Sequence, residues 1–302
     1  MNCFREQLVK LLGSSERLLL NAPLATKTTF GVGGNADYFV EAKDDVELRG
    51  ILQICNQNGV KFHILGKGSN TIVKDGGFRG VVIQLTGRWF EKIAVDGTKI
   101  ECGAGVRLKS LVIEAQRNSI GGFEFLEGIP GTVGGALKMN ASAMGSQISD
   151  VITYLKIMTY GGDIKEISKE QAGFGYRNCQ VLKDAIAIGA TFCGIKADKE
   201  VIAKKMESFA NKRFASQPKY RSAGCVFKNP YGCSAGKIID ELGLKGLMIG
   251  GAMISREHGN FIVNVNQAKA KDILELVDKV RKEVKNKHGI DLELEVEVIG
   301  ED

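Results

Sequence analysis

With 302 residues, 44% of them hydrophobic, the chain is longer than one hydrophobic core usually serves, so we expect two or three packed units. That hydrophobic content excludes a disordered chain, and the 38 glycines indicate many tight backbone approaches. The net charge of +6 is modest and the basic residues are spread along the sequence, which argues against a nucleic-acid-binding protein.

The N-terminus and the cysteines predict a cytoplasmic protein with reduced thiols. Arg5, Glu6 and Lys10 interrupt the apolar core that a signal peptide would need, and apolar runs such as 247–254 are far shorter than the roughly 20 residues that span a bilayer. Seven cysteines without a C-x-x-C pair fit neither a disulfide framework nor a zinc knuckle. The three histidines lie far apart in the sequence, so we expect no metal site.

The first half of the chain is expected to form an α+β unit after a short N-terminal helix. In chain order, the patterns predict helices over 4–12 and 44–59, strands at 60–65 and 80–85, a hairpin over 93–102, a helix from 108 to near 121, a hairpin over 151–167 and a strand over 185–192. The segment 127–145 consists mostly of glycines and small residues without a sustained period. We therefore expect it to make contacts and not to form part of the hydrophobic core.

A domain boundary is expected near residues 193–199. The elements predicted after it are a helix over 199–213, a helix around 235–242, strands near 248–254 and 261–265, a long helix over 267–287 and a strand over 291–300. In this last strand leucines and valines alternate with Glu293, Glu295 and Glu297, which predicts one buried face and one solvated face. Alternation alone does not distinguish a catalytic carboxylate among the three.

Two glycine-rich segments could bind phosphate groups. In 66-GKGSN-70 a strand leads into a turn whose N–H groups, Ser69 hydroxyl and Asn70 amide could surround an anion. The turn matches neither the Rossmann nor the Walker A pattern, and by itself it could equally be an ordinary tight turn. The run 128-GIPGTVGG-135 strengthens the binding interpretation, because two such loops could hold the two phosphates of a dinucleotide. The alternative is that both segments only turn the chain.

Eight short motifs follow one another across roughly residues 22–300. They are TTF-x-VGG-x-A at 28–36, GKGSN at 66–70, EGIPGTVGGALKMNA at 127–141, GYR at 175–177, AGCVFKNP at 223–230, GLKG at 243–246, EHGNFIVN at 257–264 and LELEVEVIG at 292–300. In their order and spacing the chain resembles the UDP-N-acetylenolpyruvoylglucosamine reductase (MurB) family of peptidoglycan synthesis. The short length is similar to the family's second type, which lacks an extra substrate-gripping loop.

The resemblance implies an α+β fold with two functional domains. A helical extension over 1–21 would precede a vanillyl-alcohol-oxidase/PCMH-like FAD-binding domain over 22–192, with lobes at about 22–78 and 79–192. A smaller α+β substrate-binding domain would occupy 193–302, with its last strand returning toward the active site.

The resemblance also implies a cofactor and two substrates. Noncovalent FAD would take a hydride from NADPH, and UDP-N-acetylglucosamine enolpyruvate would then occupy the same cleft and become UDP-N-acetylmuramate. No sequence pattern here distinguishes NADPH from NADH. The cofactor-binding residues implied are Gly66, Lys67, Gly68, Ser69, Asn70, Pro130, Gly131, Thr132, Gly134, Gly135, Asn140 and Ala141.

Three residues match the family's catalytic positions. Hydride delivery to C3 of the enolpyruvyl group builds charge on its carboxylate, which the Arg177 guanidinium would hold and Glu295 would help to polarise. Cys225 stands where the family usually has the serine that protonates C2. A thiol with an ordinary pKa near 8.5 is mostly protonated at neutral pH and is a stronger acid than a hydroxyl. The alternative is that Cys225 is a buried structural thiol.

Further residues match the family less closely. The substrate-side positions are Arg213, Asn229, Lys237, Lys245 and His258. Lys237 could equally be a surface lysine and His258 a structural histidine. Ser142 and Met144 depart from the family's M-N-A-G-A-Y-G pattern, so the details of the flavin loop stay open.

Two other classes of function compete with a reductase. One is a thiol enzyme in which Cys225 is the nucleophile and His258 the base. The other is a flavin- or nucleotide-binding protein without turnover. For the assembly, a monomer is expected.

Overall fold

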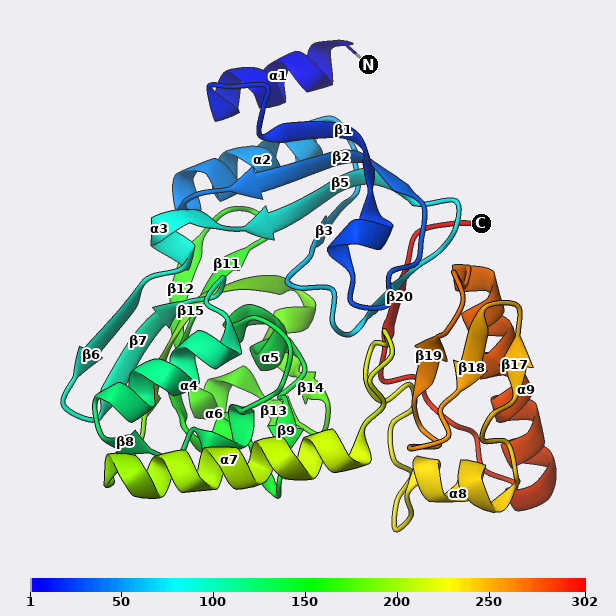
Figure 1. Cartoon of the computed structure of the whole chain (residues 1–302). Coiled ribbons are helices and arrows are strands. Elements are labelled where there is room, and N and C mark those ends of the chain that lie inside the picture. Colours follow the sequence, from blue (N-terminus) through cyan, green and yellow to red (C-terminus); the bar gives the residue numbers. More distant parts are fainter. Residues whose placement is uncertain (1) are drawn as a thin grey trace. The chain divides into compact units, whose positions relative to one another are not determined.

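The computed structural model describes residues 2–302, and the chain divides into two compact units that each combine several segments (Figure 1). The first unit comprises residues up to Leu20, Tyr38–Gly66 and Gly80–Lys212, and the second comprises Asn21–Asp37, Lys67–Arg79 and Arg213–Asp302. The units are interleaved in sequence, so they differ from the linear division at 22 and 193. That division concerns the binding functions of the domains, and it stays a prediction.

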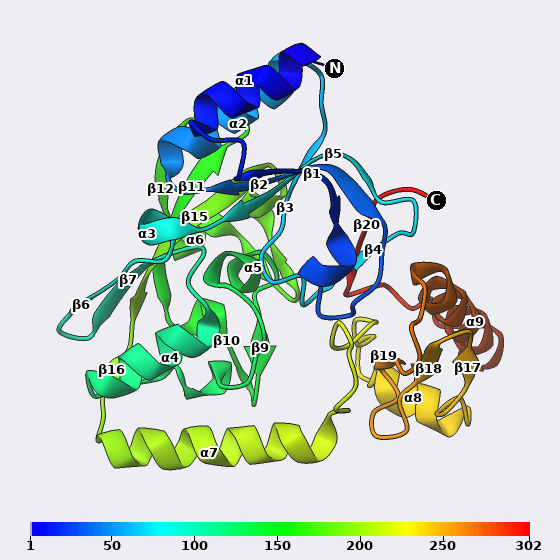
Figure 2. The ribbon, with the colours of Figure 1, turned by 45° about the horizontal axis from the view of Figure 1, so that its top comes forward.

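The first unit begins with helix α1 (Asn2–Leu12) and contains α2 (Asp45–Gln57), which lies beside α1 (Figure 2). Its first sheet has the strand order β1 (Leu18–Pro23), β2 (Asn35–Ala42), β5 (Phe78–Leu85) and β3 (Phe62–Ile64). One end of β1, β2 and β5 consists of residues that are assigned to the second unit. Asp44 caps α2 by accepting the N–H of Glu47, as expected for a carboxylate at a helix start. The predicted apolar stripe of α2 is buried, which confirms that helix.

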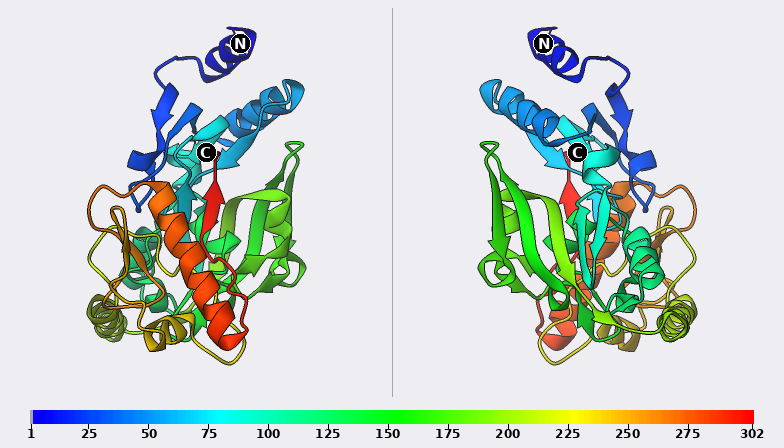
Figure 3. Two further views of the ribbon diagram at one scale, coloured as in Figure 1. Left: turned by 90° about the vertical axis from the view of Figure 1, so that its right-hand side faces the viewer. Right: turned by 90° about the vertical axis from the view of Figure 1, so that its left-hand side faces the viewer.

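The second sheet of this unit is antiparallel and has five strands. Their order is β12 (Ile164–Ser168), β11 (Ile152–Thr159), β15 (Ala185–Cys193), β7 (Lys99–Gly103) and β6 (Ile93–Asp96), and β11, β12 and β15 are drawn in green in Figure 3. Both predicted hairpins, β6–β7 and β11–β12, are confirmed. Helix α4 (Leu108–Arg117) buries its predicted apolar face in the same core.

One expectation for the first unit is wrong. The segment 127–145 contains helix α5 (Val133–Lys138), and Val133, Ala136 and Leu137 are buried in the hydrophobic core. Gly134 and Gly135 lie inside this six-residue helix and hide its period, yet so short a helix still buries three apolar side chains. The segment therefore contributes core as well as contacts.

The remaining elements of the first unit are too short to show a period in the sequence. They are α3 (Gly87–Phe90), α6 (Lys169–Ala172), β8 (Ile120–Gly121), β9 (Ser142–Ala143), β10 (Ser146–Gln147), β13 (Phe174–Gly175), β14 (Asn178–Cys179), β16 (Ile195–Lys196) and the 3-10 turns Glu124–Leu126, Ile148–Asp150 and Gln180–Lys183. Helix α7 (Lys199–Ser216) runs to the end of this unit at Lys212 and four residues beyond it.

The second unit packs two helices with short strands. Its elements are the 3-10 turn Leu24–Lys27, β4 (Thr71–Val73), α8 (Ala235–Glu241), β17 (Met248–Ile249), β18 (Ala252–Ile254), β19 (Ile262–Asn264), α9 (Ala270–His288) and β20 (Glu297–Ile299). Strands β17, β18 and β19 form an antiparallel sheet, so the single strand expected near 248–254 is a hairpin. The predicted stripe of α9 is buried, which confirms that helix.

The strand expected over 291–300 is shorter than predicted. Only Glu297–Ile299 forms a strand, which pairs in parallel with β4, and Leu294 makes an isolated bridge to Phe227. Leu292 and Val296 are buried, whereas Leu294 is half-buried. The alternation in the sequence therefore reflects burial on one side, and regular pairing begins only at Glu297.

No helix within residues 2–302 is both long and apolar enough to cross a bilayer. Among the same residues, no cluster of three histidine, cysteine or carboxylate side chains could hold a metal ion.

Candidate functional site

In the first unit, the predicted cofactor residues around Thr132 lie where the chain enters α5. The Thr132 hydroxyl caps the helix, with its Oγ1 3.4 Å from the N of Gly135. The N–H groups of Val133 and Gly134 donate to the backbone oxygens of Val106 and Ala104. Those of Gly131 and Thr132 donate to no acceptor among residues 2–302. Two adjacent backbone donors are thus available to an anion.

The two glycine-rich segments meet at Gly66 and Thr132. A Cβ atom on Gly66 would lie 2.8 Å from the Oγ1 of Thr132, so only glycine fits without a shift. The carbonyl of Gly66 accepts a hydrogen bond of 2.7 Å from Gln84 Nε2. Gly66 therefore allows a close approach of two chain segments, which is a structural reason for glycine beside any role in binding.

Asn140 joins the α5 segment to the predicted catalytic GYR motif. Its buried Nδ2 donates to Gln147 Oε1 and to the Gly175 carbonyl, both at 3.0 Å, and its Oδ1 accepts from the Ser149 N–H. Both amide donors are therefore used inside the protein. The Asn140 side chain therefore holds Gly175, Gln147 and Ser149 in place, and it has no N–H left to donate to a cofactor.

Arg177 is half-buried, and its φ of 53° is uncommon for a residue other than glycine. Its Nη1 donates to Ser142 Oγ at 2.5 Å, and its guanidinium carbon lies 5.3 Å from the centre of the Tyr176 ring. Such backbone outliers concentrate at functional sites. The contact also explains what Ser142 does, because this departure from the family pattern holds the predicted carboxylate-binding arginine.

In the second unit, the rest of the GKGSN turn packs against residues 27–29. Gly68 has a φ of 59°, and a Cβ there would lie 2.5 Å from the carbonyl oxygen of Lys27. Nearby, the Thr28 Oγ1 is buried and has no hydrogen-bond partner among the described residues. Thr28 was not predicted as a site residue, although it opens the first motif. A buried, unsatisfied hydroxyl costs stability, and a ligand atom that bonds it would remove that cost.

Asn70 links the GKGSN turn to the terminal segment. Its Nδ2 donates to the Glu295 carbonyl at 3.0 Å, and its own carbonyl accepts the Glu297 N–H at 2.9 Å. One of its two amide donors is thus directed to Glu295, the predicted catalytic glutamate. Asn70 positions that residue whatever else it binds.

Cys225 is half-buried and lies next to the Glu295 segment. It forms an isolated bridge with Phe261, and the Glu295 N–H donates to the carbonyl of Val226 at 2.8 Å. The thiol is not enclosed in the core, in contrast to Cys55 and Cys179. Burial raises the pKa of those two thiols to about 12 and about 11, so they stay protonated.

His258 and Lys245 lie close enough to interact. Burial chiefly, and the Lys245 charge in addition, lower the pKa of His258. The ring accepts a hydrogen bond at Nδ1 from the Asn260 N–H at 3.1 Å, and this leaves the hydrogen of a neutral imidazole on Nε2. Lys245 also pairs with Asp240, with Nζ and Oδ2 2.6 Å apart. His258 has a structural bond and keeps Nε2 available.

The other substrate-side candidates differ in their surroundings. Arg213 is half-buried near the end of α7, and its Nη2 lies 3.3 Å from Gln217 Oε1. Asn229 Oδ1 accepts the Ala235 N–H at the start of α8. Lys237 is exposed, and its Nζ lies 3.8 Å from Oε1 of Glu241, one helical turn away. This is the arrangement expected of a surface lysine on a helix.

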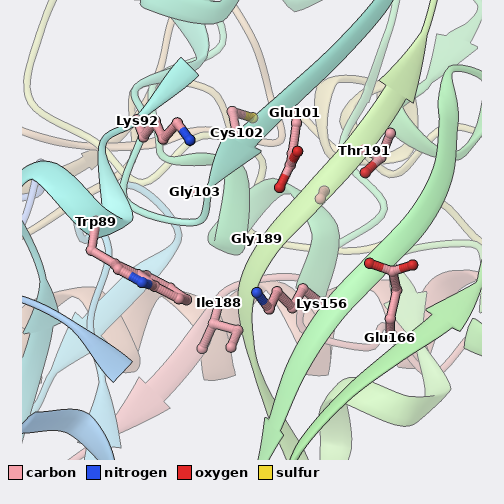
Figure 4. Close-up of a pocket in the computed structure, with 11 residues that line it drawn as sticks. Trp89, Lys92, Glu101, Cys102, Gly103, Lys156, Glu166, Ile188, Gly189 and Thr191 are labelled. Carbon is pink, nitrogen blue, oxygen red and sulfur yellow. The ribbon is translucent and has the colours of Figure 1, made fainter. Parts of the chain in front are cut away.

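One pocket of about 210 Å³ lies on the five-stranded sheet of the first unit (Figure 4). Gly103 and Gly189, which pair across β7 and β15, form part of its lining, and Lys156 Nζ lies 5.3 Å from the centre of the Trp89 ring. Charged residues of both signs also line it. None of the predicted cofactor, substrate or catalytic residues does, so the pocket is separate from the predicted site.

The observed donors fit the FAD that the motifs imply. In the first unit, the N–H groups of Gly131 and Thr132 can donate to phosphate oxygens. In the second unit, the unsatisfied hydroxyl of Thr28 can bond a polar atom of a ligand. The residues present are therefore compatible with a phosphate-containing cofactor.

Comparisons with known proteins identify two family domains in the chain. Residues 36–168 match the FAD binding domain, and residues 217–299 match the C-terminal domain of UDP-N-acetylenolpyruvoylglucosamine reductase. The predicted fold class, a PCMH-like FAD-binding domain followed by a smaller α+β domain, is confirmed by these matches and by the solved relative described next.

Relatives that match over nearly their full length belong to the same family as the two domain matches. A UDP-N-acetylenolpyruvoylglucosamine reductase of Lachnoclostridium phytofermentans is 41% identical over 100% of this chain and 99% of the relative, and one of Clostridium botulinum is 43% identical over 93% of each. The crystal structure of the Thermus caldophilus enzyme (MurB) is 40% identical, with a TM-score of 0.81 over 94% of this chain and 98% of that one. The chain therefore belongs to the UDP-N-acetylenolpyruvoylglucosamine reductase (MurB) family of FAD-dependent oxidoreductases.

Proposed function

We propose that this chain reduces UDP-N-acetylglucosamine enolpyruvate to UDP-N-acetylmuramate with NADPH, in peptidoglycan precursor synthesis, and that Cys225 supplies the proton. Bound FAD would accept a hydride from NADPH and deliver it to C3 of the enolpyruvyl group. The observation that carries the residue assignment is the direct hydrogen bond between the Cys225 and Glu295 segments, from the Glu295 N–H to the Val226 carbonyl at 2.8 Å.

Cys225 would complete the reduction by protonating C2. The hydride forms the new C–H bond at C3, the electron pair of the double bond shifts toward C2 and the carboxylate, and the thiol proton forms the C–H bond at C2. The resulting thiolate regains a proton from solvent before the next turnover. The half-buried position of Cys225 supports this role, because a fully enclosed thiol could neither meet a substrate nor be reprotonated.

Arg177 and Glu295 would act on the carboxylate of the enolpyruvyl group. Negative charge increases there as the hydride arrives, and a guanidinium offers two parallel donors to a carboxylate. The Ser142 contact supports the arginine role, because it restricts the side chain before substrate binds. Glu295 would contribute as a protonated or hydrogen-bonded carboxyl group.

The remaining predicted residues would hold the ligands. In the first unit, FAD phosphates would bind the N–H groups of Gly131 and Thr132. In the second unit, the predicted Ser69, and also Thr28, which was not predicted, would offer hydroxyl groups to a ligand. The substrate's anionic groups would bind Arg213, Lys245 and His258, of which His258 offers Nε2 because Nδ1 is already occupied. We place Lys237 last among the substrate-side candidates, because it is exposed and has an ion-pair partner on its own helix.

The chain would work in the cytoplasm as a monomer. None of its seven cysteines forms a disulfide, which suits a reducing compartment. All assigned roles come from residues of a single chain, so the reaction needs no second copy.

An anaerobic titration of the purified protein tests the proposed reaction. The protein should carry a flavin absorbance band, NADPH should bleach it, and the enolpyruvyl sugar should restore it with formation of UDP-N-acetylmuramate. A preparation without flavin, and with none released on denaturation, would contradict the reductase and favour the thiol enzyme. Flavin that NADPH bleaches but the sugar does not restore would favour a binding protein without this turnover.

A further inference from the structure

The side chain of Asn260 bonds both backbone groups of one residue close to Cys225. Its Oδ1 accepts the Phe227 N–H at 2.9 Å, and its Nδ2 donates to the Phe227 carbonyl at 2.7 Å. Asn260 is only 3% exposed. This two-way bond is the pattern by which paired residues of antiparallel strands hold one another. Here an amide side chain takes the place of a strand.

The backbone of Asn260 is engaged in the same region. Its carbonyl accepts the Val226 N–H at 2.8 Å, and its N–H donates to His258 Nδ1. One residue further on, Phe261 forms the bridge with Cys225. Asn260 thus bonds the chain on the C-terminal side of Cys225 through both its backbone and its side chain.

The Cys225 segment needs such a partner because it belongs to no regular strand. Between residues 222 and 230 the chain makes only isolated bridges. On the side opposite Asn260, the Glu295 and Glu293 segment bonds Val226 and Lys228 through the backbone. The thiol is therefore carried by a short irregular segment held between two others, and Asn260 supplies the side-chain part of one of those contacts.

We propose that Asn260 is a positioning residue for proton transfer, acting through the backbone that carries Cys225. This inference rests on the proposed role of Cys225 as the proton donor. Asn260 is buried and both ends of its amide are occupied by Phe227, so it does not act on substrate directly. Its removal leaves a Phe227 backbone group unsatisfied and lets the segment move, and a shift of about 1 Å at a reacting group can lower a rate by roughly 100-fold.

Asn260→Asp is the most informative variant, with Asn264→Asp as its matched control. The first keeps the acceptor for the Phe227 N–H but replaces the donor to the Phe227 carbonyl by an oxygen. Asn264 lies four residues on and also makes two side-chain bonds to backbone, to Phe30 and Ala268, but none to the Cys225 segment. Both variants bring a carboxyl group next to a carbonyl, so a general loss of stability is common to the two.

Two measurements separate positioning from stability. We expect Asn260→Asp to slow flavin reoxidation by the enolpyruvyl sugar at least about 10-fold while flavin reduction by NADPH changes less than about twofold. We also expect the rate at which iodoacetamide modifies Cys225, relative to exposed Cys193 and Cys233 in the same molecule, to rise about threefold or more as the segment loosens. Asn264→Asp should leave both quantities within about twofold of the wild type.

Combination with Cys225→Ala tests whether Asn260 acts through the thiol. If it does, Asn260→Asp should cause no further slowing in the Cys225→Ala background, whereas independent effects multiply. Equal slowing in both backgrounds, or equal effects of the Asn260 and Asn264 variants, would overturn the inference. Should Asn260→Asp fail to fold, Asn260→Ser, which retains one hydrogen-bonding group, undergoes the same measurements.

Failure of the proposed function gives a different result. If Cys225→Ala reoxidises at the wild-type rate, Cys225 is not the proton donor, whatever Asn260 does. If Cys225→Ala is slow and Asn260→Asp is normal in both measurements, only the positioning role is wrong.

Discussion

The two compact units hold their predicted functional residues in different ways. In the first, Thr132 lies at the start of a helix and Gly66 lies just after a strand, so regular elements fix the positions of these two cofactor candidates. In the second, Cys225 and Glu295 stand on irregular chain that isolated bridges and asparagine side chains hold in place. A binding turn can thus be encoded locally, whereas the position of a reacting group depends on partners far away in the sequence.

Cys225→Ala should give the largest effect and tests the second unit directly. Loss of a general acid typically costs about 10²- to 10⁴-fold, so flavin reoxidation by the enolpyruvyl sugar should slow by that range while reduction by NADPH stays nearly unchanged. Cys225→Ser should retain part of the rate. Stopped-flow absorbance measures both half-reactions, and equal reoxidation by wild type and Cys225→Ala would return the thiol to a structural role.

Arg177→Ala makes the corresponding test in the first unit. Loss of the guanidinium should slow the sugar-dependent half-reaction by about 10²- to 10³-fold, because the charge that grows on the carboxylate loses its donors. Arg177→Lys should recover only part, since an ammonium lacks the planar fork. Exposed Arg117 is a control, and Arg117→Ala should be neutral. If Arg177→Ala slowed only the reduction of the flavin by NADPH, Arg177 would not be the residue that binds the enolpyruvyl carboxylate.

Ser142→Gly introduces the glycine that is typical of the family and tests how the first unit holds Arg177. Loss of the 2.5 Å contact should leave Arg177 less restricted, and one hydrogen bond worth about 1 kcal/mol corresponds to roughly a fivefold rise in KM for the sugar. Steady-state kinetics with saturating NADPH measures this. A lower KM would mean instead that Ser142 competes with the substrate for the arginine.

The smallest expected effect concerns His258 and pH. Burial lowers its pKa in the folded protein, so the unfolded chain binds more protons at this position. The stability contribution is complete above the unfolded pKa of about 6.5 and is lost as pH falls through the lower folded pKa. The urea midpoint should therefore decrease between pH 7.5 and pH 5.5, and less so in His258→Asn, which keeps an acceptor for the Asn260 N–H. An identical decrease in the two proteins would exclude His258 as the cause.

The sequence predicts well what depends on local pattern. The apolar stripes of α2, α4 and α9 identify those helices because a helix that packs on a core must repeat its apolar residues every three or four positions. The same reasoning misses α5, whose single buried turn is too short to repeat. It also overextends the terminal strand, because alternating burial does not require a hydrogen-bonded partner along the whole segment.

In the candidate site, too, the sequence predicts residues that lie in local motifs but not the contacts between distant segments. The motifs bring Cys225, Arg177 and Glu295 to attention as residue types, but the supporting contacts of Ser142, Asn70 and Asn260 depend on the folded backbone. Asn260 lies inside a recognised motif, yet its partner Phe227 is 33 residues away, and no local period connects them. Thr28 was overlooked for a similar reason, since only the fold reveals that its hydroxyl is buried without a partner.

The pairing of β20 with β4 has a consequence for how the protein is made. The strand directly after the GKGSN turn pairs with Glu297–Ile299, so more than 220 residues must be synthesised after this turn before its strand can pair. A chain that stops before Glu297 would therefore lack the partner of β4, and its second unit would stay incomplete.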